Sequence, residues 1–222
     1  MRRLVITVDG PAGAGKSSAS RALAGRLGYA YVDTGAMYRA VGVVAWERHV
    51  PLDNDEALGH LLTALRFEVR DGGGGMAVDG HDVSQAIRRP DAGELASRVS
   101  TRPIVRERLV ALQRELGAAG GVVMEGRDIG TVVFPEAALK FYLTATPAER
   151  ARRRAAELRG RGESIDEAAL AADLAARDHR DSTRTVSPLR PAADAQLLDT
   201  TDIGLDEVVR RMEVLARARL AE

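Results

Sequence analysis

The chain has 222 residues, of which 45% are apolar and 29% charged, and its 32 basic residues balance 32 acidic ones to a formal charge of +0. This length fits one sizeable domain, or one core with a smaller insert, and excludes two large independent domains. The absence of cysteine and of any long apolar run excludes disulfides, thiolate chemistry and a membrane span, while the balanced charge argues against broad coating of nucleic acid. We expect a cytoplasmic protein with neither a membrane nor a nucleic acid as its partner.

The N-terminal part predicts a strand, a loop and a helix. Residues 4–8 form a short apolar run rich in β-branched side chains, as in a buried strand. Residues 17–27 place apolar side chains on one face at helical spacing, and Gly28 ends that helix. A second strand is expected at 29–32 and a second helix at 36–48.

Strands and helices continue to alternate along the chain. Further strands are expected at 122–124, 139–144 and 196–198. Further helices are expected at 55–65, 104–118, 147–158, 165–180 and 205–220. The pattern therefore predicts an α/β fold with a five-stranded parallel sheet flanked by helices.

Two local features stand apart from this alternation. Between residues 66 and 84, short alternating runs joined by the glycines at 72–75 predict a small hairpin insert with a flexible surface loop. Trp46 lies at helical spacing from Gly42 and Val43, so we expect it to pack against the protein.

Residues 10–17 match the P-loop pattern, with glycine first and sixth, followed by lysine and a hydroxyl residue. The glycines permit a sharp turn from strand to helix whose N–H groups converge on phosphate oxygens. Lys16 can reach the β- and γ-phosphates, and the Ser17 hydroxyl can join the shell of a Mg²⁺ ion. The predicted nucleotide-binding residues are Gly10, Pro11, Ala12, Gly13, Ala14, Gly15, Lys16, Ser17 and Ser18.

The P-loop alone leaves switch GTPases, ATPases and small-molecule kinases open. A guanine-reading Asn-Lys-x-Asp stretch is missing, because Lys16 and Lys140 are the only lysines, and this disfavours a GTP switch. A kinase needs a second anion-binding cluster, and residues 33–39, which end in Tyr38 and Arg39, follow the second strand at the same sheet edge. Those two side chains also fit a helix start with a core aromatic residue and a solvated cation.

Arginines gather in two later segments. Arg150, Arg152, Arg153 and Arg154 fall within little more than one helical turn, so Arg150 shares a face with Arg153 or Arg154 while the four cannot all face one side. Residues 177–184 mix arginine with aspartate. Both patterns are typical of solvated helix faces, with ion pairs worth roughly a few tenths of a kcal/mol each. Phosphoryl transfer, however, requires positive charge of this kind around the transferring group.

Four segments of the chain together resemble bacterial cytidylate kinases. They are residues 9–17, 33–39, 125–135 and 177–195. The run Glu-Gly-Arg-Asp-Ile-Gly-Thr-Val-Val-Phe-Pro at 125–135 is far more specific than the P-loop, and the likeness covers nearly the whole chain. It implies transfer of the γ-phosphoryl group of ATP to CMP and dCMP with the help of Mg²⁺.

The resemblance also implies a division of the chain and a set of site residues. The kinase core would comprise 1–60 and 99–222, with a mobile Arg-rich lid at about 150–163, and residues 61–98 would form the acceptor-binding insert. The implied substrate-binding residues are Thr34, Tyr38, Arg39, Ser97, Arg106, Arg127, Asp128, Arg177, Asp181 and Arg184. The implied catalytic residues are Lys16, Arg127, Arg153 and Arg184. Within these sets, Ser97, Arg106 and Asp128 would face the cytosine.

Two other functions stay open at this point. One is a kinase for a different small acceptor, and the other is a P-loop regulatory or nucleic-acid-binding protein that uses ATP as a switch. The zero net charge and the lack of a basic tail count against the second. We expect a monomer, because families with closing lids usually act as monomers.

Overall fold

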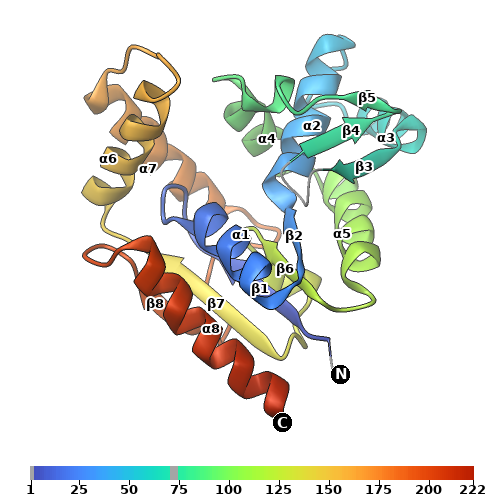
Figure 1. The fold of residues 1–222 in the computed structure, drawn as a ribbon. Coiled ribbons are helices and arrows are strands. Elements are labelled where there is room, and N and C mark those ends of the chain that lie inside the picture. Colours follow the sequence, from blue (N-terminus) through green and yellow to red (C-terminus); the bar gives the residue numbers. More distant parts are fainter. Residues whose placement is uncertain (1–2, 71–74) are drawn as a thin grey trace.

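A five-stranded parallel sheet in the order β2-β6-β1-β7-β8 forms the centre of the molecule in a computed structural model that describes residues 3–70 and 75–222 (Figure 1). The strands are β1 (Val5–Asp9), β2 (Ala30–Asp33), β6 (Val122–Glu125), β7 (Leu139–Thr144) and β8 (Gln196–Asp199). Each lies within two residues of its predicted position. The predicted parallel α/β sheet is therefore confirmed.

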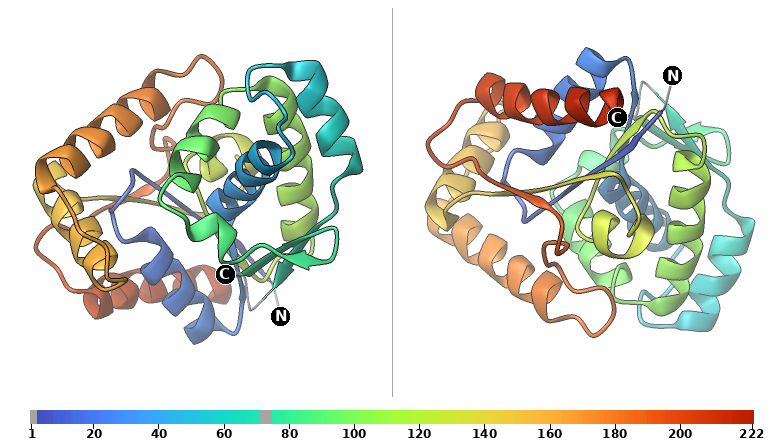
Figure 2. Two further views of the ribbon diagram at one scale, coloured as in Figure 1. Left: turned by 90° about the horizontal axis from the view of Figure 1, so that it is seen from above. Right: turned by 90° about the horizontal axis from the view of Figure 1, so that it is seen from below.

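Helices α1 (Lys16–Leu27) and α8 (Leu205–Ala221) cover one face of this sheet, opposite the face on which α7 (Glu167–Thr183) lies (Figure 2). Their apolar side chains form a continuous core with strands β1 and β7, in which Ile6, Leu23 and Met212 are fully buried. This core fixes the first turn of α1 against the carboxyl end of β1, where the P-loop lies.

A second lobe lies beside the sheet and has its own apolar core. It contains α2 (Thr34–Glu47), α3 (Asp55–Ala64), α4 (Ala92–Val99) and α5 (Pro103–Gly117). A small antiparallel sheet of β3 (Phe67–Arg70), β4 (Gly75–Val78) and β5 (His81–Asp82) packs on these helices. The predicted hairpin is therefore confirmed, with β5 in addition, while most of its predicted glycine loop lies outside the described residues.

Helices α6 (Pro147–Arg159) and α7 form an antiparallel pair on the other side of the P-loop (Figure 1). Thr146 caps α6 through the N–H of Glu149, and Asp166 caps α7 through the N–H groups of Ala168 and Ala169. The predicted lid segment thus comprises most of α6 and the turn after it. None of the helices that the structure describes is long and apolar enough to cross a bilayer.

Several elements differ from their predictions. Helix α2 begins at Thr34 because the Asp33 carboxylate accepts a hydrogen bond from the N–H of Ala36. Helix α4 and a π-helical turn at Ile129–Val133 were not predicted, since both are short. The predicted packing of Trp46 is wrong: its side chain is 55% exposed, because burial along α2 ends at Ala45.

Candidate active site

The loop between β1 and α1 has the geometry that the P-loop pattern predicts. Gly10 has a φ of 143°, and a Cβ there would lie 2.0 Å from the backbone oxygen of Leu143, so this position requires glycine. Gly15 precedes α1 in the left-handed region with a φ of 84°. Lys16 Nζ donates a hydrogen bond to the Pro11 carbonyl at 2.8 Å, which folds the side chain back over the loop. The loop, the start of α1 and Lys16 together form an anion-binding site.

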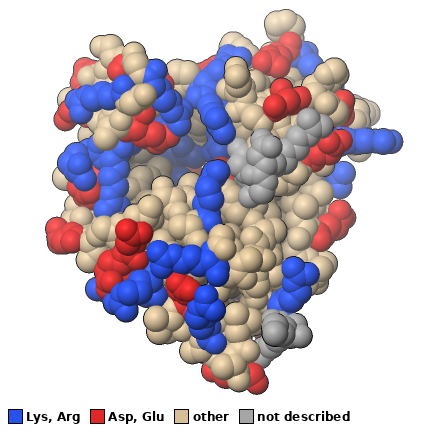
Figure 3. Space-filling model, viewed as in Figure 1, with Lys and Arg blue, Asp and Glu red and all other residues tan. Residues whose placement is uncertain are grey.

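Three cations lie close together beside this loop. Burial and the charge of Arg127 lower the pKa of Lys16 to about 7. The same two causes lower the pKa of Arg177 to about 10. Figure 3 shows lysine and arginine side chains around a hollow between the α6–α7 pair and the second lobe. Cations whose pKa is lowered by a neighbouring cation favour a polyanionic ligand, because its charge relieves their repulsion.

Arg127, two residues after β6, joins three parts of the molecule. Its Nε donates to Asp181 of α7 at 2.8 Å, and its Nη1 donates to the Gly10 carbonyl of the P-loop at 3.0 Å. Burial raises the pKa of Asp181, but the charge and hydrogen bond of Arg127 outweigh it, so the net shift is downward and the carboxylate stays ionised. The predicted residues Arg127 and Asp181 are therefore in contact, with Arg177 close by.

A second, deeply buried group lies next to the first. Arg106 of α5 donates a hydrogen bond to Asp128, and Arg184 Nη2 lies 3.5 Å from the other oxygen of that carboxylate. The Arg106 guanidinium lies over the ring of Tyr38, 5.8 Å from its centroid. Within residues 3–70 and 75–222, the buried Nη1 of Arg106 and Nη2 of Arg184 have no hydrogen-bond partner. Free donors beside a carboxylate suit a ligand that carries both acceptors and a donor.

Thr34 and Arg39 are held at the start of α2. The Thr34 hydroxyl donates to the backbone oxygen of Glu125 at 2.7 Å, which ties α2 to the end of β6. Arg39 Nη2 pairs with Asp33 at 2.8 Å. The same carboxylate caps α2, so one residue sets both the helix start and the direction of the Arg39 side chain.

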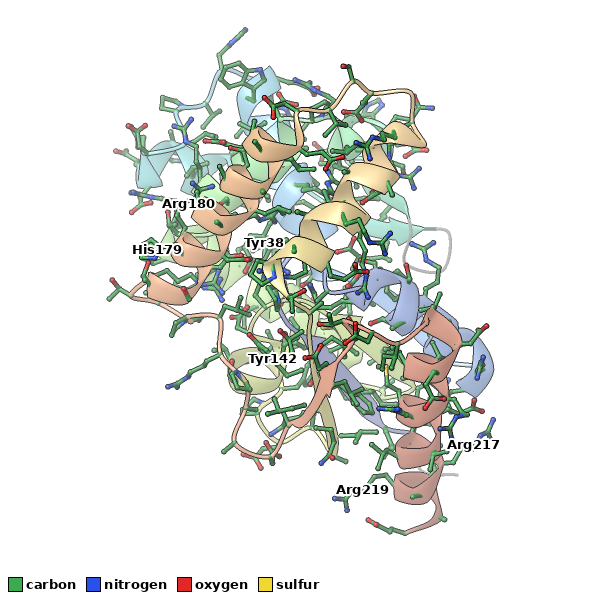
Figure 4. All side chains as sticks on the ribbon, turned by 90° about the vertical axis from the view of Figure 1, so that its left-hand side faces the viewer. Tyr38, Tyr142, His179, Arg180, Arg217 and Arg219 are labelled. Carbon is green, nitrogen blue, oxygen red and sulfur yellow. The ribbon has the colours of Figure 1, made fainter. Side chains whose placement is uncertain are left out.

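Ser97 lies on α4, across from α7. Its hydroxyl accepts a hydrogen bond from Arg180 Nε at 3.3 Å, so this contact joins the second lobe to the α6–α7 pair. In Figure 4, Tyr38 is seen between α6 and α7, while Arg180 projects from α7. Arg177 also approaches α4, because a Cβ on Gly93 would lie 3.3 Å from its Nη1.

The arginines of α6 divide between two faces. Arg150 Nη1 donates to the Ala12 carbonyl of the P-loop at 3.1 Å and pairs with Asp178 of α7. Arg153 Nη1 donates to the Thr200 hydroxyl at 2.8 Å, and its guanidinium lies 3.6 Å from the position that a Cβ on Gly15 would take. The predicted shared face of Arg150 and Arg153 is thus the face toward the P-loop.

Sequence reasoning missed Glu125, the last residue of β6. Burial raises its pKa, with Asp33 adding to the effect, while Lys16 and hydrogen bonds from Tyr31 and Ser17 act in the opposite direction. The signal that could have found it is an acidic residue at the end of a strand that pairs in parallel with the P-loop strand. Such an acid reaches the same sheet edge as Ser17, where a P-loop protein holds its metal ion.

Comparison with known proteins agrees with this geometry. A profile of the family described as cytidylate kinase matches residues 6–218. The cytidylate kinase of Syntrophotalea carbinolica is 48% identical over 213 residues, which cover 95% of this chain and 91% of the relative. The chain belongs to the cytidylate kinase family. A second cytidylate kinase, from Symbiobacterium thermophilum, is 47% identical over 98% of this chain and 97% of its own length.

A solved kinase shares the fold of this cytidylate kinase family member. A solved gluconokinase from Sinorhizobium meliloti aligns over 99% of this chain and 97% of its own with a TM-score of 0.51, at 18% identity. That likeness concerns the fold alone. The predicted P-loop kinase fold and the predicted family are confirmed, whereas the roles of individual site residues stay predictions.

Proposed function

We propose that this protein transfers the γ-phosphoryl group of ATP to CMP and dCMP, producing ADP and CDP or dCDP, as a step in pyrimidine nucleotide metabolism. The observation that supports the proposal most strongly is that two groups of side chains adjoin: the cations beside the P-loop and the buried group around Asp128. The cations at the P-loop suit a triphosphate and an acceptor phosphate, and the buried Arg106–Asp128 pair suits a base with both acceptors and an amino donor. The names of the relatives point to the same acceptor.

The residues can perform this reaction without forming a covalent intermediate. Phosphoryl transfer needs in-line positioning and positive charge around the equatorial oxygens. Lys16 binds the β- and γ-phosphates, and Arg127 and Arg184 contact the phosphate that moves. Arg39, oriented by Asp33, holds the acceptor phosphate. Arg153 belongs to the donor side, because its guanidinium lies over the P-loop.

Mg²⁺ is part of the proposal, and the residues at the P-loop fit it. Ser17 is exposed at the start of α1, and its hydroxyl lies near enough to Glu125 for a hydrogen bond that opposes the rise in the pKa of that buried carboxyl. Mg²⁺ keeps several waters and binds few protein oxygens beside substrate phosphates. The Ser17 hydroxyl, with the Glu125 carboxyl next to it, is therefore a sufficient set of protein groups for the ion. Within the part of the chain that the structure describes, no cluster of three or more acidic or histidine side chains offers a separate metal cage. When bound, the ion offsets the charge of the phosphates.

A coupled assay of ADP release tests the function directly. We expect rapid turnover with CMP and dCMP, weak turnover with UMP and AMP, and loss of activity when EDTA removes divalent ions. Turnover with a non-nucleotide alcohol but not with CMP would indicate a kinase for another acceptor. Slow hydrolysis that is independent of any acceptor would indicate an ATP-driven switch.

The lid proposed at 150–163 predicts a change in proteolysis. ATP and CMP together are expected to protect this segment from trypsin more than either alone, because lids close over both substrates to exclude water. Arg161 already lies 3.5 Å from the backbone oxygen of Arg88 in the second lobe. Cleavage at Arg217 and Arg219 of α8, at the far end of the molecule in Figure 4, serves as the internal control. Equal cleavage of 150–163 with and without ligands would contradict the lid.

Monomeric action and a cytoplasmic location also belong to the proposal, as does the division into a core and an insert at 61–98. Light scattering on the purified protein, with and without substrates, tests the monomer.

A further inference from the structure

Lys140 is a buried cation that the proposed chemistry does not use. All other basic residues except Lys16 are arginine, so lysine is rare even where a surface cation is needed. Lys140 lies on β7, where it pairs in register with Thr7 of β1, and it is only 6% exposed. A buried ammonium needs hydrogen-bond partners nearby, because burial of a charge is costly unless the charge is paired.

The ammonium of Lys140 connects Pro135 and Asp194, which end two chain segments that begin at the site. It donates to both carboxylate oxygens of Asp194 at 2.9 Å and to the backbone oxygen of Pro135. Three acceptors thus match the three protons of the ammonium. A hydrogen bond from Lys140 lowers the pKa of Asp194, and the Asp194 side chain is 64% exposed, so its carboxylate is ionised.

Each of these segments carries residues of the acceptor site. The segment that ends at Pro135 begins with Arg127 and Asp128, and the segment that ends at Asp194 begins with Asp181 and Arg184. They meet at the site itself, where Arg127 contacts Asp181 at 2.8 Å and Arg184 lies 3.5 Å from Asp128. Residues 127–135 and 181–194 thus contact each other at their N-terminal ends, where they form the site. Lys140 joins their C-terminal ends, at Pro135 and Asp194.

The aliphatic part of Lys140 is confined as well. A Cβ added to Gly130 would lie 3.2 Å from Lys140 Cδ, so the stem runs against the backbone of the π-helical turn that follows Asp128. The N–H of Gly130 donates to Asp9 of β1 at 2.7 Å, which fixes that turn to the sheet. Arginine could not replace Lys140 in the same way, because its planar guanidinium is carried on a longer side chain and does not offer three protons from a single nitrogen.

We propose that Lys140 is a positioning residue for base recognition: through Asp194 and Pro135 it sets the placement of Arg184 against Asp128. It acts through Arg184, which is assigned to the base and to the phosphate that moves, so we expect it to affect the use of CMP and not the binding of ATP. This inference rests on the proposed function, since it concerns the same acceptor site.

The test compares Lys140→Met with Asp194→Asn and the double variant. For Lys140→Met we expect the KM for CMP to rise about tenfold and kcat to fall by less than about tenfold, with the KM for ATP within about threefold of wild type. The CMP/UMP ratio of kcat/KM should fall at least about fivefold. Asp194→Asn should produce a smaller change in the same direction, and the double variant should resemble Lys140→Met, because both residues act through one contact.

Val209→Ala is the matched control for stability, since Val209 is fully buried in the α1–α8 core away from the site. It should lower the melting temperature without changing the KM for CMP or the CMP/UMP ratio.

A lower melting temperature in Lys140→Met, with an unchanged KM for CMP and an unchanged CMP/UMP ratio, would overturn the proposal in favour of a structural role. If Lys140→Met does not fold, Asp194→Asn is the deciding variant. A KM for CMP and a CMP/UMP ratio equal to those of the wild type in Asp194→Asn would also overturn the proposal. A wild-type protein without CMP turnover would instead contradict the proposed function itself.

Discussion

Lys16→Met is expected to lower kcat by at least about a hundredfold, because it removes a charge aimed at the transferring phosphoryl group. Methionine keeps an unbranched apolar stem of similar length, so the change isolates the ammonium. The melting temperature should stay within about 3 °C of wild type, since loss of a buried cation beside Arg127 relieves repulsion while it gives up the hydrogen bond to Pro11. Coupled ADP release at saturating substrates and a thermal melt measure the two effects.

The second lysine provides a matched control for this experiment. Lys140→Met makes the same chemical change at a buried ammonium outside the P-loop, and we expect its kcat to fall by less than about tenfold, against at least about a hundredfold for Lys16→Met. Near-normal turnover of Lys16→Met would show that residues 10–17 do not act as a P-loop in catalysis.

The other large effect concerns the choice of base, and it follows from the hydrogen-bonding groups of the two pyrimidines. Cytosine presents an amino donor at position 4 and an acceptor at N3, whereas uracil reverses both. The Asp128 carboxylate can only accept, and Arg106 Nη1 is a buried donor with no partner among the described residues. Uracil would set its O4 carbonyl against the Asp128 carboxylate and its N3–H against the Arg106 donor. Each mismatch costs about 1–3 kcal/mol, so CMP should exceed UMP by about two to four orders of magnitude in kcat/KM.

Asp128→Asn is expected to shrink this CMP/UMP ratio, mostly through lost activity with CMP. The amide can turn its NH₂ group toward the uracil carbonyl, and it no longer offers cytosine a charged acceptor. The variant also removes the anion that pairs with the buried Arg106, a loss worth about 3–5 kcal/mol of folding free energy. Assays should therefore run well below its melting temperature. The ratio itself does not depend on the folded fraction, because both substrates meet the same enzyme.

Asp33→Asn is the control for Asp128→Asn. Asp33 is also a carboxylate that holds an arginine of the acceptor site, but its partner Arg39 is assigned to the phosphate, which CMP and UMP share. It should raise the KM for both nucleotides and leave their ratio unchanged. If Asp128→Asn keeps the wild-type ratio, Asp128 does not read the base, and its function would be to hold Arg106 and Arg184 in place.

The sequence by itself determined the features that depend on neighbours within a few residues. Strand and helix positions follow from apolar periodicity, and the P-loop follows from glycines at backbone angles that other residues rarely adopt, as Gly10 and Gly15 confirm. The family could be predicted because residues 125–135 form one uninterrupted, specific run. The Arg150–Arg153 face could be predicted because both residues lie on one helix with a fixed period.

Only the tertiary structure decided which side chains meet across elements. Asp128 follows β6, Arg106 lies on α5 and Arg184 follows α7, and no local rule places two such distant arginines around the Asp128 carboxylate. The same holds for Glu125 beside Ser17 and for Lys140 between Pro135 and Asp194. Burial of Trp46 was mispredicted for this reason too, since helical spacing defines a face but not how far along the helix that face is covered. These contacts depend on how the packed cores of the sheet and the second lobe place whole elements, which is a property of the fold and not of any segment.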